Sequence, residues 1–243
     1  MFDEIFAFTF GLIFGSLANL IILRFHTFEP LFFGGSKCLY CGKRLKWFEL
    51  IPLFSFIVQK GRCRKCSTRL SFQYPAIEIL TGVLFLFIWL KFENLSPYFF
   101  LSLFFWYLLF LASLYDLKHQ ILPDEFIFGG VFLAILGNFL FFRPGLLYSL
   151  AAGFSFFFFF VFLWFLTKKQ GLGLGDAKMA LALGIFLGFP KAVFGLIFSF
   201  WLGGAVGIAL LALKKANLKT PIPFGPFLFL GSFIAFFLDL GKF

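Results

Sequence analysis

Charged residues and histidines are scarce in this sequence of 243 residues. Asp, Glu, Lys and Arg make up 13% of the chain and hydrophobic residues 61%, whereas an ordinary soluble domain carries about 25% charged residues. The composition therefore excludes a typical soluble domain and predicts a membrane protein with several spans. The only two histidines, His26 and His119, do not neighbour a serine motif. This argues against catalysis by a histidine-activated serine or cysteine.

The hydrophobic residues gather in eight stretches, and a membrane crossing needs about 20 of them. The stretches run at 5–23, 74–90, 97–115, 126–142, 146–167, 177–189, 191–213 and 224–240. The first is no cleaved signal peptide, because it begins with Asp3 and Glu4 rather than with a basic region. We predict an all-α polytopic membrane protein with about eight transmembrane helices, in which the run Phe156 to Phe160 faces lipid.

The basic residues are unevenly divided between the two sides that this topology defines. Of the 21 Lys and Arg residues, all but four fall on the side of the loop at 24–73. The four on the other side are Lys91, Arg143, Lys191 and Lys242. Basic residues concentrate on the cytoplasmic side of a membrane, so we predict that the 24–73 segment is cytoplasmic and that both termini lie outside. The net charge of +10 then reflects topology and not nucleic-acid binding.

The cytoplasmic segment carries all four cysteines as two C-x-x-C pairs, Cys38 with Cys41 and Cys63 with Cys66. This spacing is typical of a tetrahedral zinc site with four thiolate ligands. Two disulfides and a redox-active pair are the alternatives, but disulfides are rare in the reducing cytosol. We predict a small zinc-ribbon-like insert between the first two transmembrane helices. A site closed by four sulfurs has no open position for a reactive water, which favours a structural role.

Two carboxylates are predicted at the cytoplasmic ends of membrane helices. Asp176 follows Gly173 and Gly175 directly before an apolar stretch, where it either caps a helix or takes part in chemistry. Asp116 ends another apolar stretch, so both residues can lie at the same membrane depth. Asp124 is the rival to Asp116, but it follows a proline and suits the first turn of a helix. Lys178 either contacts lipid head groups or stabilises the charge of Asp176.

Two neighbouring carboxylates do not easily both ionise, and the pair titrates as a unit. An aspartic protease uses this arrangement: one carboxylate activates water and the other protonates the carbonyl oxygen of the substrate. An ion or proton path in a transporter and a zinc-containing scaffold without chemistry are the alternatives. The catalytic pair predicted from the residues is Asp116 and Asp176.

The chain resembles the type IV prepilin peptidase family over nearly its whole length. The resemblance rests on Gly15-Ser16, Asn19, Arg24, both cysteine pairs, Ile51-Pro52, Ser55, Gly61-Arg62-Cys63, Tyr74-Pro75, Glu78, Asp116, Leu122-Pro123-Asp124, Gly173-Leu174-Gly175-Asp176, Lys178 and Pro223-Phe224-Gly225-Pro226. His26 stands where a proline is usual, and Glu49 lies in a variable segment. Neither departure touches the protease motifs.

The resemblance implies an aspartic endopeptidase of the bacterial inner membrane that cuts the basic leader of prepilins and pseudopilins at the cytoplasmic face. It implies Asp116 and Asp176 as the catalytic pair, Gly173, Gly175, Lys178 and Asp124 as supporting residues, and the four cysteines as zinc ligands. It also implies methylation of the new N-terminus from S-adenosylmethionine, although a glycine-rich motif of the soluble methyltransferases is missing. The expected divisions are a first transmembrane helix at 1–23, the insert at 24–73 and a seven-helix protease domain at 74–243, in contact with membrane lipid.

Overall fold

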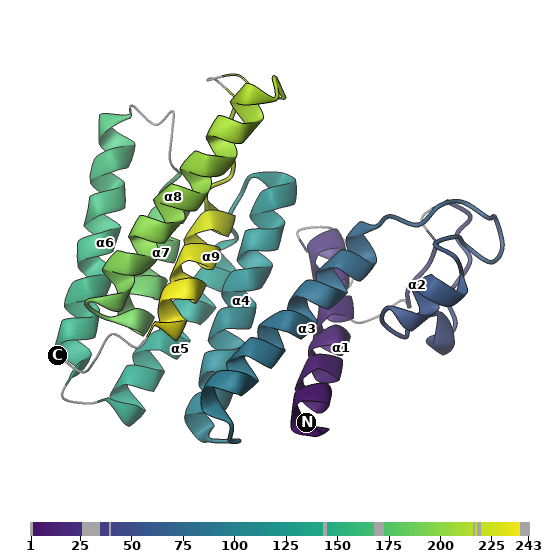
Figure 1. Ribbon diagram of the computed structural model, residues 1–243, viewed down its shortest axis with the longest axis horizontal. Helices are drawn as coiled ribbons and strands as arrows, with labels where there is room; N and C mark the ends of the chain where they lie inside the picture. Colours follow the sequence, from purple (N-terminus) through teal and green to yellow (C-terminus); the bar gives the residue numbers. More distant parts are fainter. Residues whose placement is uncertain are drawn as a thin grey trace. The chain divides into compact units, whose positions relative to one another are not determined.

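The computed structural model describes residues 2–25, 35–38, 40–142, 145–167, 173–215, 217 and 220–238. Three residues named above lie outside this part, namely His26, Arg143 and Lys242. Within it the chain is helical, and the only β-bridges are two isolated antiparallel ones, Lys37 with Arg44 and Arg62 with Arg69. The all-α class is therefore confirmed (Figure 1).

All eight predicted stretches form helices, and two further short helices lie in the insert. The bounds are α1 Phe2–Arg24, η1 Trp47–Glu49, α2 Phe54–Val58, α3 Gln73–Phe92, α4 Pro97–His119, α5 Asp124–Phe141, α6 Leu146–Leu166, α7 Leu174–Leu187, α8 Lys191–Ala212 and α9 Gly225–Phe237. In the described part, six of them are long and apolar enough to cross a membrane, namely α1, α3, α4, α5, α6 and α8. With 14 and 13 residues, α7 and α9 are shorter, so a count of eight crossings stays a prediction.

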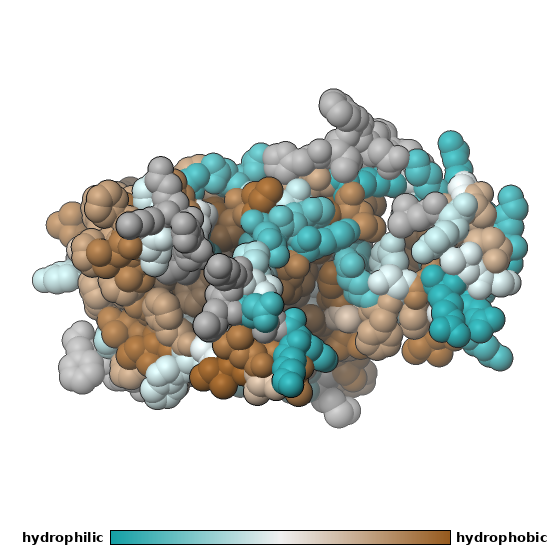
Figure 2. Space-filling model, turned by 90° about the horizontal axis from the view of Figure 1, so that it is seen from above, coloured by the Kyte–Doolittle hydropathy of each residue, from teal (hydrophilic) through white to brown (hydrophobic). Residues whose placement is uncertain are grey.

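The chain divides into two compact units, residues Met1–Leu95 and Ser96–Phe243. The first joins α1, the cysteine insert and α3, and the second contains α4 to α9. The boundaries predicted at 23/24 and 73/74 stay predictions. In Figure 2 the insert shows many hydrophilic side chains, and the visible face of the second unit carries much hydrophobic surface.

Within the first unit, α1 packs closely along α3. The glycines of α1 make this approach possible: a methyl group added at Gly15 would lie 2.5 Å from Cα of Glu78, and one added at Gly11 would lie 2.7 Å from Cα of Gly82. The buried Asn19 amide adds a polar link by donating a 3.1 Å hydrogen bond to the carbonyl of Tyr74. Small residues and interhelical hydrogen bonds are the usual means of helix association in lipid.

Within the second unit, α4 has the largest buried share of any candidate span. It packs against α5 and α9, and its fully buried Trp106 contacts the rings of Phe186 in α7 and Phe229 and Phe233 in α9. Because α4 is enclosed by its neighbours, a polar group on its inner face lies in a protein environment and not in lipid.

The end of α4 and the start of α7 differ from the sequence-based bounds. The apolar stretch ends at 115, but the helix continues to His119 and stops where Gln120 adopts a left-handed conformation. Similarly, α7 begins at Leu174, three residues before its apolar stretch. Helical hydrogen bonding extends beyond the apolar stretch at both of these ends, so a boundary drawn from hydropathy underestimates the length of both helices. Asp116 and Asp176 therefore lie inside helices and not beside them.

The phenylalanine run of α6 does not face lipid as a whole. Phe158 and Phe159 are 63% and 40% exposed, whereas Phe156 and Phe160 are buried at 9% and 1%. The ring of Phe160 lies near those of Phe200 in α8 and Phe224 beside α9. Residues four apart share one face of a helix, so one side of the run packs inward. The prediction that the run faces lipid was wrong for that side.

A polar clamp that the sequence analysis missed holds α7 in place. The buried Asn138 of α5 donates to the carbonyl of Ile185 in α7 at 2.9 Å and accepts a 2.8 Å hydrogen bond from the hydroxyl of Ser149 in α6. A polar residue within an apolar span, which usually faces protein, is the signal that would have indicated it. The clamp fixes the helix that carries Asp176.

Candidate active site and metal centre

Each predicted catalytic carboxylate is buried and accepts a hydrogen bond from a backbone N–H. Asp116, on α4, is 5% exposed, and its Oδ2 atom accepts from the N–H of Gly225 at 3.1 Å. Asp176, on α7, is 6% exposed, and its Oδ2 atom accepts from the N–H of Gly173 at 2.9 Å. Buried carboxylates require such partners, because an unpaired charge away from water is strongly destabilised.

These hydrogen bonds place both carboxylates at helix N-termini. Gly225 is the first residue of α9, so Asp116 binds an N–H that the helix itself leaves unpaired. Asp176 is the third residue of α7, and Gly173 is the residue before that helix. Asp176 therefore takes part in capping from inside the first turn and is not the cap residue considered above. Its capping role leaves the other oxygen of the carboxyl group available for chemistry.

The side chain of Leu122 lies next to Gly175, beside Asp176 in the chain, and next to Gly225, whose N–H binds Asp116. A methyl group at Gly175 would meet Cβ of Leu122 at 2.9 Å. One at Gly225 would meet Cδ2 of Leu122 at 3.1 Å and Oδ2 of Asp116 at 2.7 Å. The two glycines thus make room for Leu122 between the starts of α7 and α9.

The supporting residues Lys178 and Asp124 form an ion pair with each other. Lys178 donates to both carboxylate oxygens of Asp124, at 2.7 and 2.8 Å, and lies 5.6 Å from the centre of the Phe128 ring. Asp124 belongs to the first turn of α5, with Pro123 as the cap residue. Asp124, the alternative to Asp116, is thus paired with Lys178 of α7. Neither of the two roles predicted for Lys178 from the sequence had included this partner.

This ion pair is expected to contribute little to stability. Its side chains are 32% and 52% exposed, and solvent-exposed pairs contribute about 0–1 kcal/mol. Lys178→Met and Asp124→Asn should each lower the free energy of unfolding of the full chain in detergent by no more than about 1 kcal/mol. The double variant should lose no more than either single change, which denaturant titration measures. A larger, additive loss would show that the two residues act separately.

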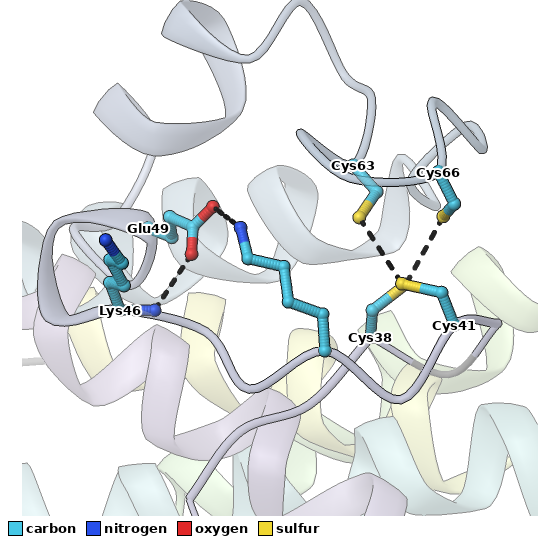
Figure 3. A network of polar contacts seen from close by, with 7 residues as sticks. Cys38, Cys41, Lys46, Glu49, Cys63 and Cys66 are labelled. Atoms are coloured by element: carbon cyan, nitrogen blue, oxygen red, sulfur yellow. Dashed lines mark hydrogen bonds and ion pairs between the residues drawn. The ribbon is translucent and has the colours of Figure 1, made fainter.

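The four cysteine sulfurs form a second candidate site, in the insert of the first unit (Figure 3). They lie within 4.8 Å of one another, with Cys38 to Cys66 at 3.9 Å and Cys41 to Cys63 at 4.0 Å. A zinc ion bound at about 2.3 Å by four tetrahedral thiolates separates its sulfurs by about 3.8 Å. A disulfide requires about 2.05 Å, and all four cysteines are free. The geometry fits a four-thiolate metal ion and not a pair of disulfides.

The protonation equilibria of the thiols also fit a cation. Hydrogen bonds with the side chain and backbone of Thr68 lower the pKa of Cys66 to about 6, and the backbone N–H groups of Cys41 and Tyr40 lower the pKa of Cys38. At Cys41 the N–H of Lys43 favours the thiolate, but desolvation and the neighbouring sulfurs outweigh it and raise the pKa to about 11. A divalent cation at the centre of the cluster would stabilise the thiolate form of all four cysteines.

Glu49 stabilises the loop beside the cysteine cluster. It is buried, forms a 2.8 Å ion pair with Lys43 and accepts from the N–H of Lys46 at 2.8 Å (Figure 3). Both interactions lower the pKa of Glu49, and the hydrogen bond from the Lys43 side chain has the larger effect. The Arg64 guanidinium of the second cysteine pair lies 5.1 Å from the ring of Phe48, next to Glu49. Nothing in the sequence had indicated this role for Glu49.

Together these features define a multi-pass helical membrane protein with a tetracysteine insert and a pair of buried carboxylates in its second unit. The model of the Bacterial Peptidase A24 N-terminal domain matches residues 9–92, and that of the Type IV leader peptidase family matches residues 103–208. The chain belongs to the type IV leader peptidase family and is a membrane protease of that family.

Curated relatives match most of the chain. A prepilin leader peptidase/N-methyltransferase of Legionella pneumophila is 32% identical over 94% of this chain and 88% of its own length. The protein of the same name from Bacillus subtilis is 31% identical over 94% of this chain and 92% of its own. That of Aeromonas hydrophila is 31% identical over 82% of this chain and 70% of its own. No solved structure matches the chain.

Proposed function

We propose that this protein cuts the leader from type IV prepilins and pseudopilins at the cytoplasmic face of the bacterial inner membrane. The observation that carries the proposal is that Asp116 and Asp176, two buried carboxylates from distant segments, have surroundings that share the side chain of Leu122. Similarity to proteins named prepilin leader peptidase/N-methyltransferase supports the substrate class. The excess of basic residues in the 24–73 segment supports the orientation.

In the proposed mechanism the two carboxyl groups share one proton. The ionised group takes a proton from a water molecule as that water attacks the scissile carbonyl carbon, and the protonated group donates to the carbonyl oxygen. The N–H groups of Gly225 and Gly173 keep one oxygen of each carboxyl group fixed during the reaction. Collapse of the tetrahedral intermediate then expels the new N-terminal amine, which takes up a proton.

We further propose that the protein methylates this amine, with S-adenosylmethionine as the methyl donor, and that the insert holds a structural zinc ion. The zinc ligands would be Cys38, Cys41, Cys63 and Cys66, whose separations suit a tetrahedral ion. Four thiolates would leave the metal without an open position. The ion would therefore stabilise the insert, and hydrolysis would depend on the carboxylates of the second unit.

The test is incubation of the purified full chain in lipid nanodiscs with a prepilin and S-adenosylmethionine, followed by mass spectrometry of the pilin N-terminus. We expect a product that lacks the leader and carries one methyl group. Without S-adenosylmethionine, the product should be cut and unmethylated. A prepilin that remains intact, although a purified relative cuts it under the same conditions, would contradict the proposal.

Gly225→Ala should impair the active site more than the fold. Its methyl group would lie 2.7 Å from Oδ2 of Asp116, so the carboxylate must move from its place. Such overpacking costs about 1–3 kcal/mol of stability, and we expect the rate of prepilin cleavage to fall by about tenfold or more. Gly204→Ala is the matched control, because nothing lies within 4 Å of the added methyl group. Equal cleavage rates for both variants would contradict the assigned position of Asp116.

A further inference from the structure

The insert exposes an apolar segment that neither the cysteine site nor the proposed reaction uses. It runs from residue 47 to 58, over η1 and α2, and is called the apolar segment below. Trp47 is 77% exposed, Phe54 60% and Ile57 70%, and Leu50, Ile51 and Val58 are exposed as well. A cluster of large exposed apolar side chains on an extramembrane element indicates a contact surface.

Two contacts attach the apolar segment to the start of the membrane helix α3. The backbone N–H of Leu53 donates a 2.8 Å hydrogen bond to the buried carboxylate of Glu78. The ring of Phe56 in α2 makes an edge-on contact with the ring of Phe72, at a centroid distance of 6.3 Å. Phe72 directly precedes α3, and Glu78 lies five residues into it, or about 8 Å along the helix axis. The apolar segment is thereby held beside the first turns of α3.

The chemistry of the apolar segment fits the boundary between lipid and water. Phe72, 73% exposed, continues the apolar surface onto the membrane helix. Trp47 is of the residue type that gathers at membrane interfaces. Lys46 and Lys60, both exposed, bracket the segment in sequence, and Arg44 and Arg62 lie close beyond them. Apolar side chains with flanking Lys and Arg are the features with which interfacial helices bind anionic lipid.

We propose that the apolar segment of the insert docks onto the anionic phospholipid surface beside α3 and holds the cysteine insert against the membrane. Its side chains, led by Trp47, Phe54 and Ile57, enter the head-group region, and the flanking lysines contact lipid phosphates. The attachment to Glu78 sets the depth of docking. The proposal depends on α3 as a membrane span and on no step of the proteolytic reaction.

The test is photocrosslinking of the full chain in nanodiscs. Ile57, or in the control Lys65, is replaced by p-benzoylphenylalanine, and the adducts are identified by mass spectrometry. Both positions are exposed, so the replacements leave the packing intact, and thermal unfolding of each variant checks its folding. We expect a lipid adduct at position 57 and none at position 65, with a higher yield in phosphatidylglycerol than in phosphatidylcholine alone.

Lys46→Gln combined with Lys60→Gln should remove the gain that phosphatidylglycerol gives while leaving the lipid adduct in place. Three outcomes would overturn the proposal: no lipid adduct at position 57, a crosslink from position 57 to a second copy of the chain or to a prepilin in place of lipid, or equal yields in the two lipids. Cleavage activity measured on the same samples is a separate readout, so a failure of the docking proposal does not affect the proposed reaction.

Discussion

Asp116→Asn and Asp176→Asn are each expected to abolish prepilin cleavage while the protein still folds and inserts. Asparagine keeps an oxygen that accepts from the N–H of Gly225 or Gly173, so the helix starts remain capped. It cannot exchange a proton with water or with the scissile carbonyl. Loss of a general acid or base costs about 10²–10⁴-fold in rate, and we expect the upper end, because each carboxylate needs the other.

The measurement is the single-turnover cleavage rate of a prepilin in nanodiscs, with thermal unfolding as the check of folding. Asp124→Asn is the matched control, because Asp124 is exposed and paired with Lys178, and it should cut at close to the unaltered rate. The variant that combines Asp116→Asn with Asp176→Asn should cut no more slowly than either single variant, because removing one member of a pair that acts as a unit already removes the effect of both. Normal cleavage by Asp116→Asn with loss in Asp124→Asn would reassign the first acid.

Cys63→Ser is expected to have the second largest effect, on metal content and on the structure of the insert. Cys63 is 4% exposed and lies 4.0 Å from the sulfur of Cys41, so serine would remove one of four ligands from a closed site. A structural zinc ion contributes about 10 kcal/mol or more to the folding of a small domain. We expect the zinc content to fall from one ion per chain to almost none and the amides of residues 35–70 to lose protection from hydrogen exchange.

The control for this experiment is Lys65→Ala, an exposed position between Cys63 and Cys66, which should retain zinc. Because the metal is proposed to be structural, the helices of the second unit should keep their protection in Cys63→Ser. A chelator should reproduce the effect of the substitution on the unaltered chain. Full protection of the insert after zinc has been removed would contradict a structural role for the metal.

The membrane class and the chemistry of the two sites were predictable from the sequence. Hydropathy is a local property, so all eight apolar stretches were found, with errors at their ends such as those beside Asp116 and Asp176. The spacing of the cysteines identified a four-thiol cluster, because two short turns are enough to bring four sulfurs together. The pairing of Asp116 with Asp176 was a prediction from topology, and both lie in the second unit with Leu122 between their surroundings.

The partners of these residues were not predictable, because they come from segments far apart in the chain. Asp116 and Gly225 are 109 residues apart, and Lys178 and Asp124 are 54 apart. Periodicity shows which residues share a face of one helix, but it does not show which helix covers that face. The same holds for Phe156 and Phe160, whose apolar character suited lipid and protein equally.

The sequence by itself determined that this is a helical membrane protein with four clustered thiols and two acids at helix ends, because composition, hydropathy and spacing act within short segments. Only the tertiary structure decided that Asp116 binds the first N–H of α9 and that Leu122 fills the space left by Gly175 and Gly225. It also decided that an apolar segment of the insert stays exposed next to α3. These outcomes depend on how helices pack sideways, which is fixed by contacts between distant residues and by the close approach that glycine permits.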